Sequence, residues 1–117
     1  YRVVGVAHFA AGNPVLLTEE GLQVALLGVR VPAALQEQAL GYLKTYVVGK
    51  RVLLRFECPH ESAGQPVPVY LYLTNRLFVN RKMIEMGLAE ADREREYRYR
   101  ERFIEAERRR NGTQRLV

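Results

Sequence analysis

The sequence predicts one α+β domain, with five short strands and three helices around a single core. Apolar and polar residues alternate in five stretches, a period of two that indicates strands. In three other stretches the apolar residues recur every three or four positions, as they do on one face of a helix. A chain of 117 residues is long enough to bury one core and leaves little room for a second.

The first third of the chain is predicted to be a three-stranded meander. Residues 1–9 form the first strand, and a turn that contains Gly12 leads into a strand over residues 14–18. A second turn at Gly21 leads into the third strand, residues 22–29, in which apolar side chains occupy alternate positions.

A helix and two further strands follow the meander. After Pro32 the apolar period changes, which predicts a helix over residues 33–47 that ends before Gly49. Residues 51–57 and 67–73 are predicted as the fourth and fifth strands, and the loop between them contains two prolines.

The last part of the chain is predicted to be helical. The second and third helices span residues 79–88 and 94–110. The order is therefore three strands, a helix, two strands and two helices. Five short strands with a helix between the third and the fourth indicate an OB-type Greek-key β-barrel.

Charge and cysteine content limit the possible partners and compartments. The chain has 18 Lys and Arg residues against 13 Asp and Glu residues, and this net charge of +5 favours polyanionic partners. Cys58 is the only cysteine, so no disulfide can form within the chain, and a reducing, cytoplasmic location is expected. No apolar run approaches the roughly 20 residues that span a bilayer, so no membrane partner is expected. Because the sequence begins with Tyr1 rather than Met, we expect a fragment of a larger protein.

Four groups of residues, spread over nearly the whole chain, carry a resemblance to a known family through their order and spacing. They are Val24 to Pro32; the first helix with Gly49 to Val52; Val79 and Asn80 with Met83 and Gly87 to Ala89; and Tyr97, Phe103, Ala106 and Glu107. In this order and spacing the sequence resembles a staphylococcal-nuclease-like (thermonuclease) domain. The resemblance implies a five-stranded OB barrel with three helices, the fold that the periodicity also indicates.

The resemblance also implies where catalytic groups would lie. Active members of that family bind calcium with two aspartates and a backbone carbonyl, place a glutamate near the attacking water and clamp the phosphate with two arginines. These groups stabilise the charge that develops on the phosphoryl oxygens. The first aspartate falls on Asn13, the first arginine on Ala25, the second aspartate on Arg30 and the next residue on Val31, the glutamate on Ala33, and the second arginine at or near Val67.

These replacements predict a domain that does not cleave nucleic acid. Calcium needs several hard oxygen ligands, and Asn13 beside the Arg30 guanidinium cannot supply them, so no metal and no other cofactor is expected. Two interpretations of Arg30 stay open. In the first, Arg30 contacts a phosphate through its forked guanidinium. In the second, Arg30 is a solvated side chain at the mouth of a lost site.

The leading functional prediction is a catalytically inactive nuclease-like domain that binds DNA or RNA as an accessory module of a larger nucleic-acid-processing protein. An alternative is a protein-interaction or structural module whose charge only confers solubility. A third is an active phosphodiesterase with a relocated site. For this third function the sequence offers only the loop with Cys58, His60 and Glu61, which is also typical of an ordinary polar loop.

Candidate nucleic-acid contacts lie in the fifth strand and the third helix. Two tyrosines of the strand point outward from the predicted barrel and could stack on bases or pack under a helix. Three arginines and a tyrosine of the helix could form a basic strip, although interleaved glutamates favour a solvated face with ion pairs. Together with Arg30 the candidates are Tyr70, Tyr72, Arg95, Tyr97, Arg98 and Arg102.

Overall fold

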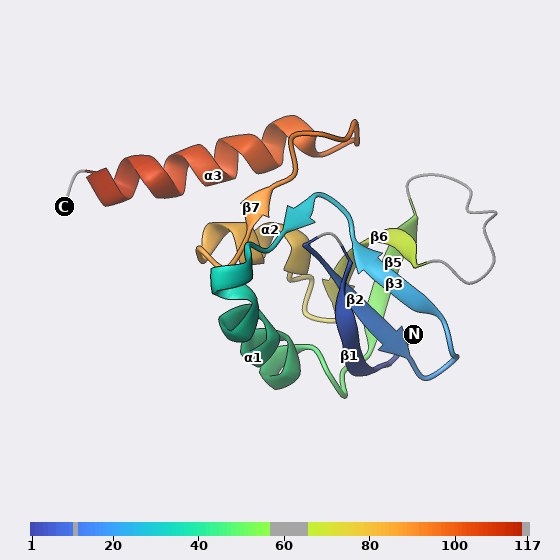
Figure 1. Cartoon of the computed structure of the whole chain (residues 1–117). Coiled ribbons are helices and arrows are strands. Elements are labelled where there is room, and N and C mark those ends of the chain that lie inside the picture. Colours follow the sequence, from blue (N-terminus) through green and yellow to red (C-terminus); the bar gives the residue numbers. More distant parts are fainter. Residues whose placement is uncertain (11, 57–65, 116–117) are drawn as a thin grey trace.

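The computed structural model describes residues 1–10, 12–56 and 66–115, and it confirms the α+β fold class with a strand barrel and three α-helices (Figure 1). Each helix and strand is named below by its order in the chain. The elements are β1 (Val3–Ala10), β2 (Asn13–Thr18), β3 (Gln23–Leu26), β4 (Val29–Arg30), the 3-10 helix η1 (Ala33–Leu35), α1 (Gln36–Tyr46), β5 (Val52–Phe56), β6 (Val67–Leu73), α2 (Val79–Glu85), β7 (Glu90–Ala91) and α3 (Arg100–Arg115).

The five longer strands form one sheet in the order β1-β2-β3-β6-β5. β1, β2 and β3 form an antiparallel meander, while β6 runs parallel to β3 and antiparallel to β5. The two ends of the sheet meet where Arg2 and Arg51 form a β-bridge. Beside this bridge the Val3 N–H donates to the Lys50 carbonyl at 3.2 Å. These contacts close the sheet into the barrel of an OB fold.

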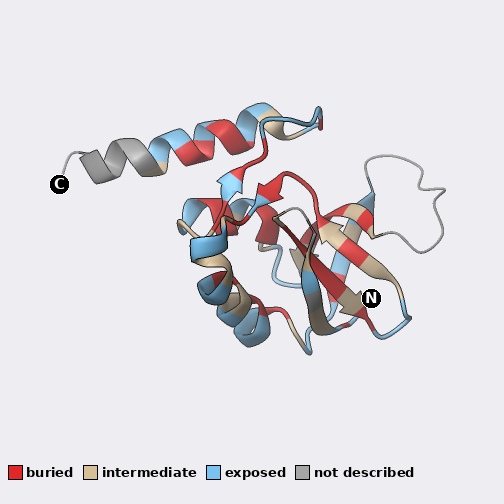
Figure 2. Cartoon of the chain, in the orientation of Figure 1, coloured by how far each residue is buried: buried red, intermediate tan, exposed pale blue. Residues whose placement is uncertain are grey.

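Alternate apolar residues fill the barrel, as the sequence pattern predicts. Val24 and Leu26 of β3 and Val69 and Leu71 of β6 are completely buried. α1 packs against β1 and buries Leu43, while its opposite face is exposed (Figure 2). Burial on one face of each element therefore explains the periods of the sequence.

A buried amide side chain ties α2 to the barrel. Asn80 is completely buried, and its Oδ1 accepts a hydrogen bond from the Leu71 N–H at 2.9 Å. Its Nδ2 donates to the carbonyls of Leu27 at 2.9 Å and Val69 at 3.1 Å. One side chain thus bonds to buried backbone groups of β6 and of the segment after β3, and the Val69 carbonyl also accepts from the Leu27 N–H at 3.0 Å.

The prediction of one continuous third strand over residues 22–29 is wrong. β3 ends at Leu26, and Gly28 has a φ of +79°, a conformation that glycine adopts without steric cost. The chain turns there and continues as β4, which pairs with β7. β7 was not predicted because two residues are too short to show a period.

The third helix begins at Arg100 rather than at residue 94. In the preceding segment the Asp92 Oδ1 accepts from the Glu94 N–H at 2.9 Å, and the Tyr97 hydroxyl donates to the Asp92 carbonyl at 2.6 Å. Side-chain bonds of this kind compete with helix formation. They fix a short non-helical connection between β7 and α3.

α3 packs on α2 and β7 and extends beyond the barrel (Figure 1), while the beginning of the helix covers part of β6. Tyr70 of β6 is only 1% exposed, and its ring stands edge-on to Tyr99 and Phe103, with centroids 4.8 Å and 6.3 Å away. Gly28 lies beneath the same helix, since a Cβ there would come within 2.8 Å of the Phe103 ring. The glycine therefore permits the close approach of α3.

Candidate functional site

The corner around Arg30 contains residues that the sequence resemblance assigns to a nuclease site. Arg30, on β4, lies beside the turn between β1 and β2, where the Val31 N–H donates to the Gly12 carbonyl at 2.7 Å. The Arg30 side chain is 56% exposed, and its guanidinium lies 3.8 Å from the Glu94 carboxylate. Arg30 is therefore a solvent-facing cation with a loose acidic partner.

The residues at this corner do not fit a calcium ion. Asn13 is buried, and its Nδ2 donates to the Leu26 carbonyl at 3.2 Å, so the amide is used inside the barrel. Ala33, in η1, offers only a methyl group, and Arg30 brings a positive charge to a position where calcium would need an oxygen ligand. Among the described residues of this corner, Asn13, Arg30 and Ala33 therefore offer calcium no carboxylate.

The three remaining family positions carry apolar side chains. Val31 and Val67 are buried in the core, and Ala25 is half-buried on β3, opposite Pro68 of β6. None of these three can supply the guanidinium that would clamp a phosphate. Their side chains stabilise the barrel through burial of apolar surface.

Two of the tyrosines predicted to stack on bases are buried, so the structure contradicts that role for them. Tyr70 lies beneath α3, because the outward face of β6 is turned toward this helix. Tyr97 is 7% exposed, packs against Phe103 and donates its hydroxyl hydrogen to the Asp92 carbonyl. Both rings join α3 and its preceding segment to the barrel.

The predicted strip of arginines is divided between a helix and the segment before it. Arg95 is an exposed residue of that segment. Arg98 and Arg102 flank the ring of Tyr99, and each guanidinium carbon lies 5.8 Å from the ring centroid, within the range of cation–π attraction. Farther along α3, Arg109 forms an ion pair with Glu105 at 3.3 Å.

Tyr72, Arg98 and Arg102 come together with residues that the sequence analysis did not select. Leu53 of β5 is the cross-strand partner of Tyr72, and Tyr99 lies close enough to Tyr72 to influence the pKa of its hydroxyl. This set, named here the arginine–aromatic surface, consists of Leu53, Arg55, Tyr72, Arg98, Tyr99 and Arg102.

The ring of Tyr72 lies at the centre of this surface and is held from one side. It stacks on Phe78 with the centroids 4.5 Å apart and the planes 16° apart. Tyr72 is half-buried, with Phe78 as its bridge partner on one side and Leu53 as its cross-strand partner on the other. Leu53, 65% exposed, stands beside it.

The electrostatic field at Tyr72 combines contributions from two elements. Burial raises the pKa of the Tyr72 hydroxyl, and the neighbouring Tyr99 raises it further. The positive charges of Arg55 and Arg98 act in the opposite direction on the same pKa. An arginine of β5 and an arginine before α3 therefore both lie close enough to influence one hydroxyl group.

Sequence reasoning missed half of the arginine–aromatic surface for a physical reason. Leu53 and Arg55 lie in the predicted fourth strand and Tyr99 in the predicted third helix, and none of the three belongs to the predicted contacts. The available signal was the antiparallel register of β5 and β6, which sets Leu53 opposite Tyr72 and Arg55 opposite Tyr70. Residues paired in this way share one face of a sheet.

A pocket of about 700 Å³ lies between α2 and α3. Arginines and glutamates alternate in its lining, and two of the ion pairs there are Arg81 with Glu85 at 3.2 Å and Arg109 with Glu105 at 3.3 Å. The lining has four arginines and three glutamates, so most of its charge is compensated and the pocket carries no strong preference for a ligand of either sign.

Other kinds of site were also sought in the described part of the chain. Within residues 1–10, 12–56 and 66–115, no group of three His, Cys, Asp or Glu side chains is placed to hold a metal ion. The loop with Cys58, His60 and Glu61 lies outside the described residues. No helix among those described is both long and apolar enough to cross a membrane.

Comparisons with known proteins support the fold. Neither a known protein family nor a curated protein matches the sequence. Among solved structures, the chain is similar to the extended Tudor domain of Tudor-SN (p100) from Drosophila melanogaster, with a TM-score of 0.62 and 18% sequence identity. The match covers 99% of this chain and 65% of the length of that structure. At this identity the likeness supports the nuclease-like OB fold and says nothing of activity or partners.

Proposed function

We propose that this chain is a nuclease-like OB domain that binds nucleic acid without cleaving it, as an accessory module of a larger DNA- or RNA-processing protein. The arginine–aromatic surface carries this proposal. It combines three arginines with aromatic rings, and these are the groups that contact the phosphates and the bases of nucleic acids.

The charge of this surface favours an anionic ligand. Its three charged side chains are all arginines, whose guanidinium groups match the geometry of phosphate oxygens. Among the described residues, neither Arg55 nor Arg102 takes part in an ion pair. Within the described part of the chain, neither guanidinium would have to leave a carboxylate partner to contact a phosphate.

The corner around Arg30 supports a non-catalytic role. Hydrolysis of a phosphodiester needs groups that stabilise charge on the phosphoryl oxygens and activate a water molecule. Arg30 alone provides a cation there, and Ala33 provides no base. Binding without cleavage is therefore the function that these residues can perform.

Two exposed arginines outside the arginine–aromatic surface are proposed as additional phosphate contacts. Arg30 keeps its guanidinium in solvent, with Glu94 as a partner that a phosphate could replace. Arg95 is exposed in the same segment as Glu94. Contacts of this kind strengthen binding without reading the base sequence.

Salt-dependent binding to a fluorescent oligonucleotide tests the proposal. We expect the affinity to fall steeply with salt, because each neutralised phosphate releases about one counterion. Arg102→Ala should weaken binding several-fold and lower the salt slope by about one. Arg109→Ala removes the same charge from the same helix, outside the arginine–aromatic surface, and should have a much smaller effect.

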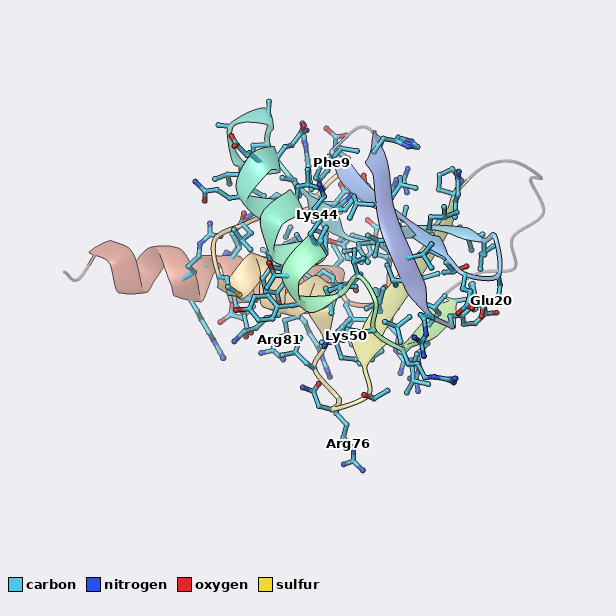
Figure 3. The ribbon with its side chains drawn as sticks, turned by 90° about the horizontal axis from the view of Figure 1, so that it is seen from below. Phe9, Glu20, Lys44, Lys50, Arg76 and Arg81 are labelled. Carbon is cyan, nitrogen blue, oxygen red and sulfur yellow. The ribbon has the colours of Figure 1, made fainter. Side chains whose placement is uncertain are left out.

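A second control variant separates specific contacts from net charge. Lys44 is an exposed residue of α1, and α1 and α3 lie on opposite sides of the domain (Figures 1 and 3). Equal losses in Arg102→Ala, Arg109→Ala and Lys44→Ala would mean diffuse attraction and would contradict a defined surface. If the unaltered chain does not bind at low salt, the proposal is wrong, and a protein-interaction module becomes the better hypothesis.

A further inference from the structure

Building on the proposed function, we infer that the arginine–aromatic surface selects single-stranded nucleic acid over duplex, and that Tyr72 is the residue on which a base stacks. In this inference the Tyr72 ring, which stacks on Phe78, recognises the nucleic acid. The ring carries the selectivity, and the arginines carry the affinity for phosphates.

The geometry of Tyr72 is suited to stacking. Phe78 lies nearly parallel to the ring on one side, at 4.5 Å between centroids, so the ring is already the last member of a stack. Leu53, 65% exposed, extends the apolar area beside it. A base stacked on the exposed part of the ring would cover this apolar area.

Only an unpaired strand offers a base for such a stack. Within a duplex the faces of each base are covered by its neighbours, whereas a single strand can turn a base outward. Proteins that bind single strands combine such rings with a positively charged path for the backbone. A duplex could contact the arginines of the surface, but its bases would not reach Tyr72.

The arginines are placed to follow the backbone of a strand whose base lies on Tyr72. Arg55 is two residues from Leu53 on β5, so the two side chains lie on the same face of the sheet. On the α3 side, Arg98 and Arg102 lie over the ring of Tyr99, and both Tyr99 and Arg98 influence the pKa of Tyr72. Cations therefore lie on the β5 side and on the α3 side of the stacking position.

The stacking position is also held in place before any ligand binds. Phe78 stacks on the Tyr72 ring with the planes 16° apart and so restricts the orientation of that ring. Little side-chain freedom is then lost on binding, which favours affinity.

The experiment compares single-stranded and duplex oligonucleotides of about 15 nucleotides, the upper range of site sizes for an OB fold, at the same low salt. A pyrimidine strand of DNA, the same strand of RNA and a DNA duplex are each titrated with the full 117-residue chain and followed by fluorescence anisotropy. We expect at least one of the single strands to bind about tenfold more tightly than the duplex, the range that one stacked base provides.

Two substitutions at Tyr72 separate the ring from the hydroxyl. Tyr72→Phe keeps the ring and should keep the preference for the single strand. Tyr72→Leu keeps apolar volume over Phe78 but removes the aromatic face, and should lower single-strand affinity about tenfold with little change for the duplex. Circular dichroism establishes that both variants are folded.

Tyrosine fluorescence gives a second measurement that does not depend on affinity. The chain has seven tyrosines and no tryptophan, so tyrosine emission can be followed directly. A base stacked on Tyr72 should quench part of this emission, and the quenched part should be smaller in Tyr72→Phe at equal saturation. Leu53→Ala, at an exposed position, should weaken single-strand binding less than Tyr72→Leu.

The outcomes distinguish this inference from the proposed function. If the duplex binds as tightly as the single strands, and folded Tyr72→Leu binds like the unaltered chain, the inference is wrong while nucleic-acid binding stands. If no oligonucleotide binds at low salt, both are wrong. A loss in Tyr72→Leu that Tyr72→Phe does not share, limited to single strands, supports the inference.

Discussion

Gly28 lies directly beneath the ring of Phe103, so close that a Cβ at position 28 would come within 2.8 Å of two atoms of that ring. The same Cβ would come within 2.6 Å of Tyr97, and the φ of Gly28 is +79°. Gly28 therefore sets how closely α3 and its preceding segment approach the barrel. This approach positions Arg98, Tyr99 and Arg102 next to β6.

Gly28→Ala should destabilise the fold by about 2–4 kcal/mol, because it adds a steric clash to a backbone conformation that alanine adopts with strain. Urea unfolding measures the loss. Gly41→Ala is the matched control, since Gly41 is in α1 and a Cβ there would meet nothing within 4 Å. That variant should gain up to about 1 kcal/mol from helix propensity. Similar stability changes in the two variants would contradict the role of Gly28.

Asn80→Ala should cost about 3 kcal/mol or more, because it leaves the Leu71 N–H and the carbonyls of Leu27 and Val69 buried without this partner. Asn75→Ala is the comparison. The Asn75 Oδ1 accepts a single exposed hydrogen bond, from the Leu77 N–H at 3.0 Å, so its loss should cost less than about 1 kcal/mol. Thermal and urea unfolding of both variants tests the difference.

The fold was predictable because its determinants are local. Each strand buries one face, so buried residues alternate with less buried ones, as at Val24 and Leu26 in β3 and at Val69 and Leu71 in β6. That alternation is visible in the sequence. The interruption at Gly28 was not predictable in the same way. The apolar residues of the sequence continue on both sides of Gly28, so the pattern does not show the turn. The turn depends on the pairing of β4 with β7, a segment much later in the chain.

The candidate site was only partly predictable because it depends on packing between distant segments. Tyr70 and Tyr72 have the same alternation in the sequence, yet α3 covers Tyr70 and leaves Tyr72 half-exposed. This difference in burial depends on where α3 begins. Hydrogen bonds of Asp92 and Tyr97 determine that position, and the periodicity of the sequence does not reveal them. Roles that depend on which element covers a residue therefore required the structure.

The stability of the fold should decrease at alkaline pH, in part through Tyr97. Burial and the Asp92 carboxylate raise the pKa of Tyr97 above its ordinary value of 10.0. Above that pH the unfolded chain releases the Tyr97 proton while the folded chain keeps it, so the free energy of unfolding falls as pH rises. Tyr97→Phe should make this fall less steep between about pH 10 and 11. Urea unfolding at several pH values measures the slope, and identical slopes would contradict the assignment.

Calcium should neither activate the chain nor stabilise it. A ligand that binds only the folded state raises the thermal midpoint, and the Arg30 corner offers a guanidinium and a methyl group where calcium needs oxygen. We therefore expect the same midpoint with and without millimolar calcium, and no cleavage of DNA or RNA. A calcium-dependent rise in the midpoint that Asn13→Ala abolishes would show that the corner binds the ion after all.

Arg30→Ala tests whether the corner still binds a phosphate. If Arg30 contacts one, its removal should weaken nucleic-acid binding and lower the salt slope by about one, because one fewer counterion is released. Arg109→Ala removes the same charge at a position that is ion-paired with Glu105, and its effect should be smaller. Glu94→Gln should act in the opposite direction, because Glu94 competes with a phosphate for the Arg30 guanidinium. Equal losses in Arg30→Ala and Arg109→Ala would mean that Arg30 contributes only through net charge and is a solvated side chain at a lost site.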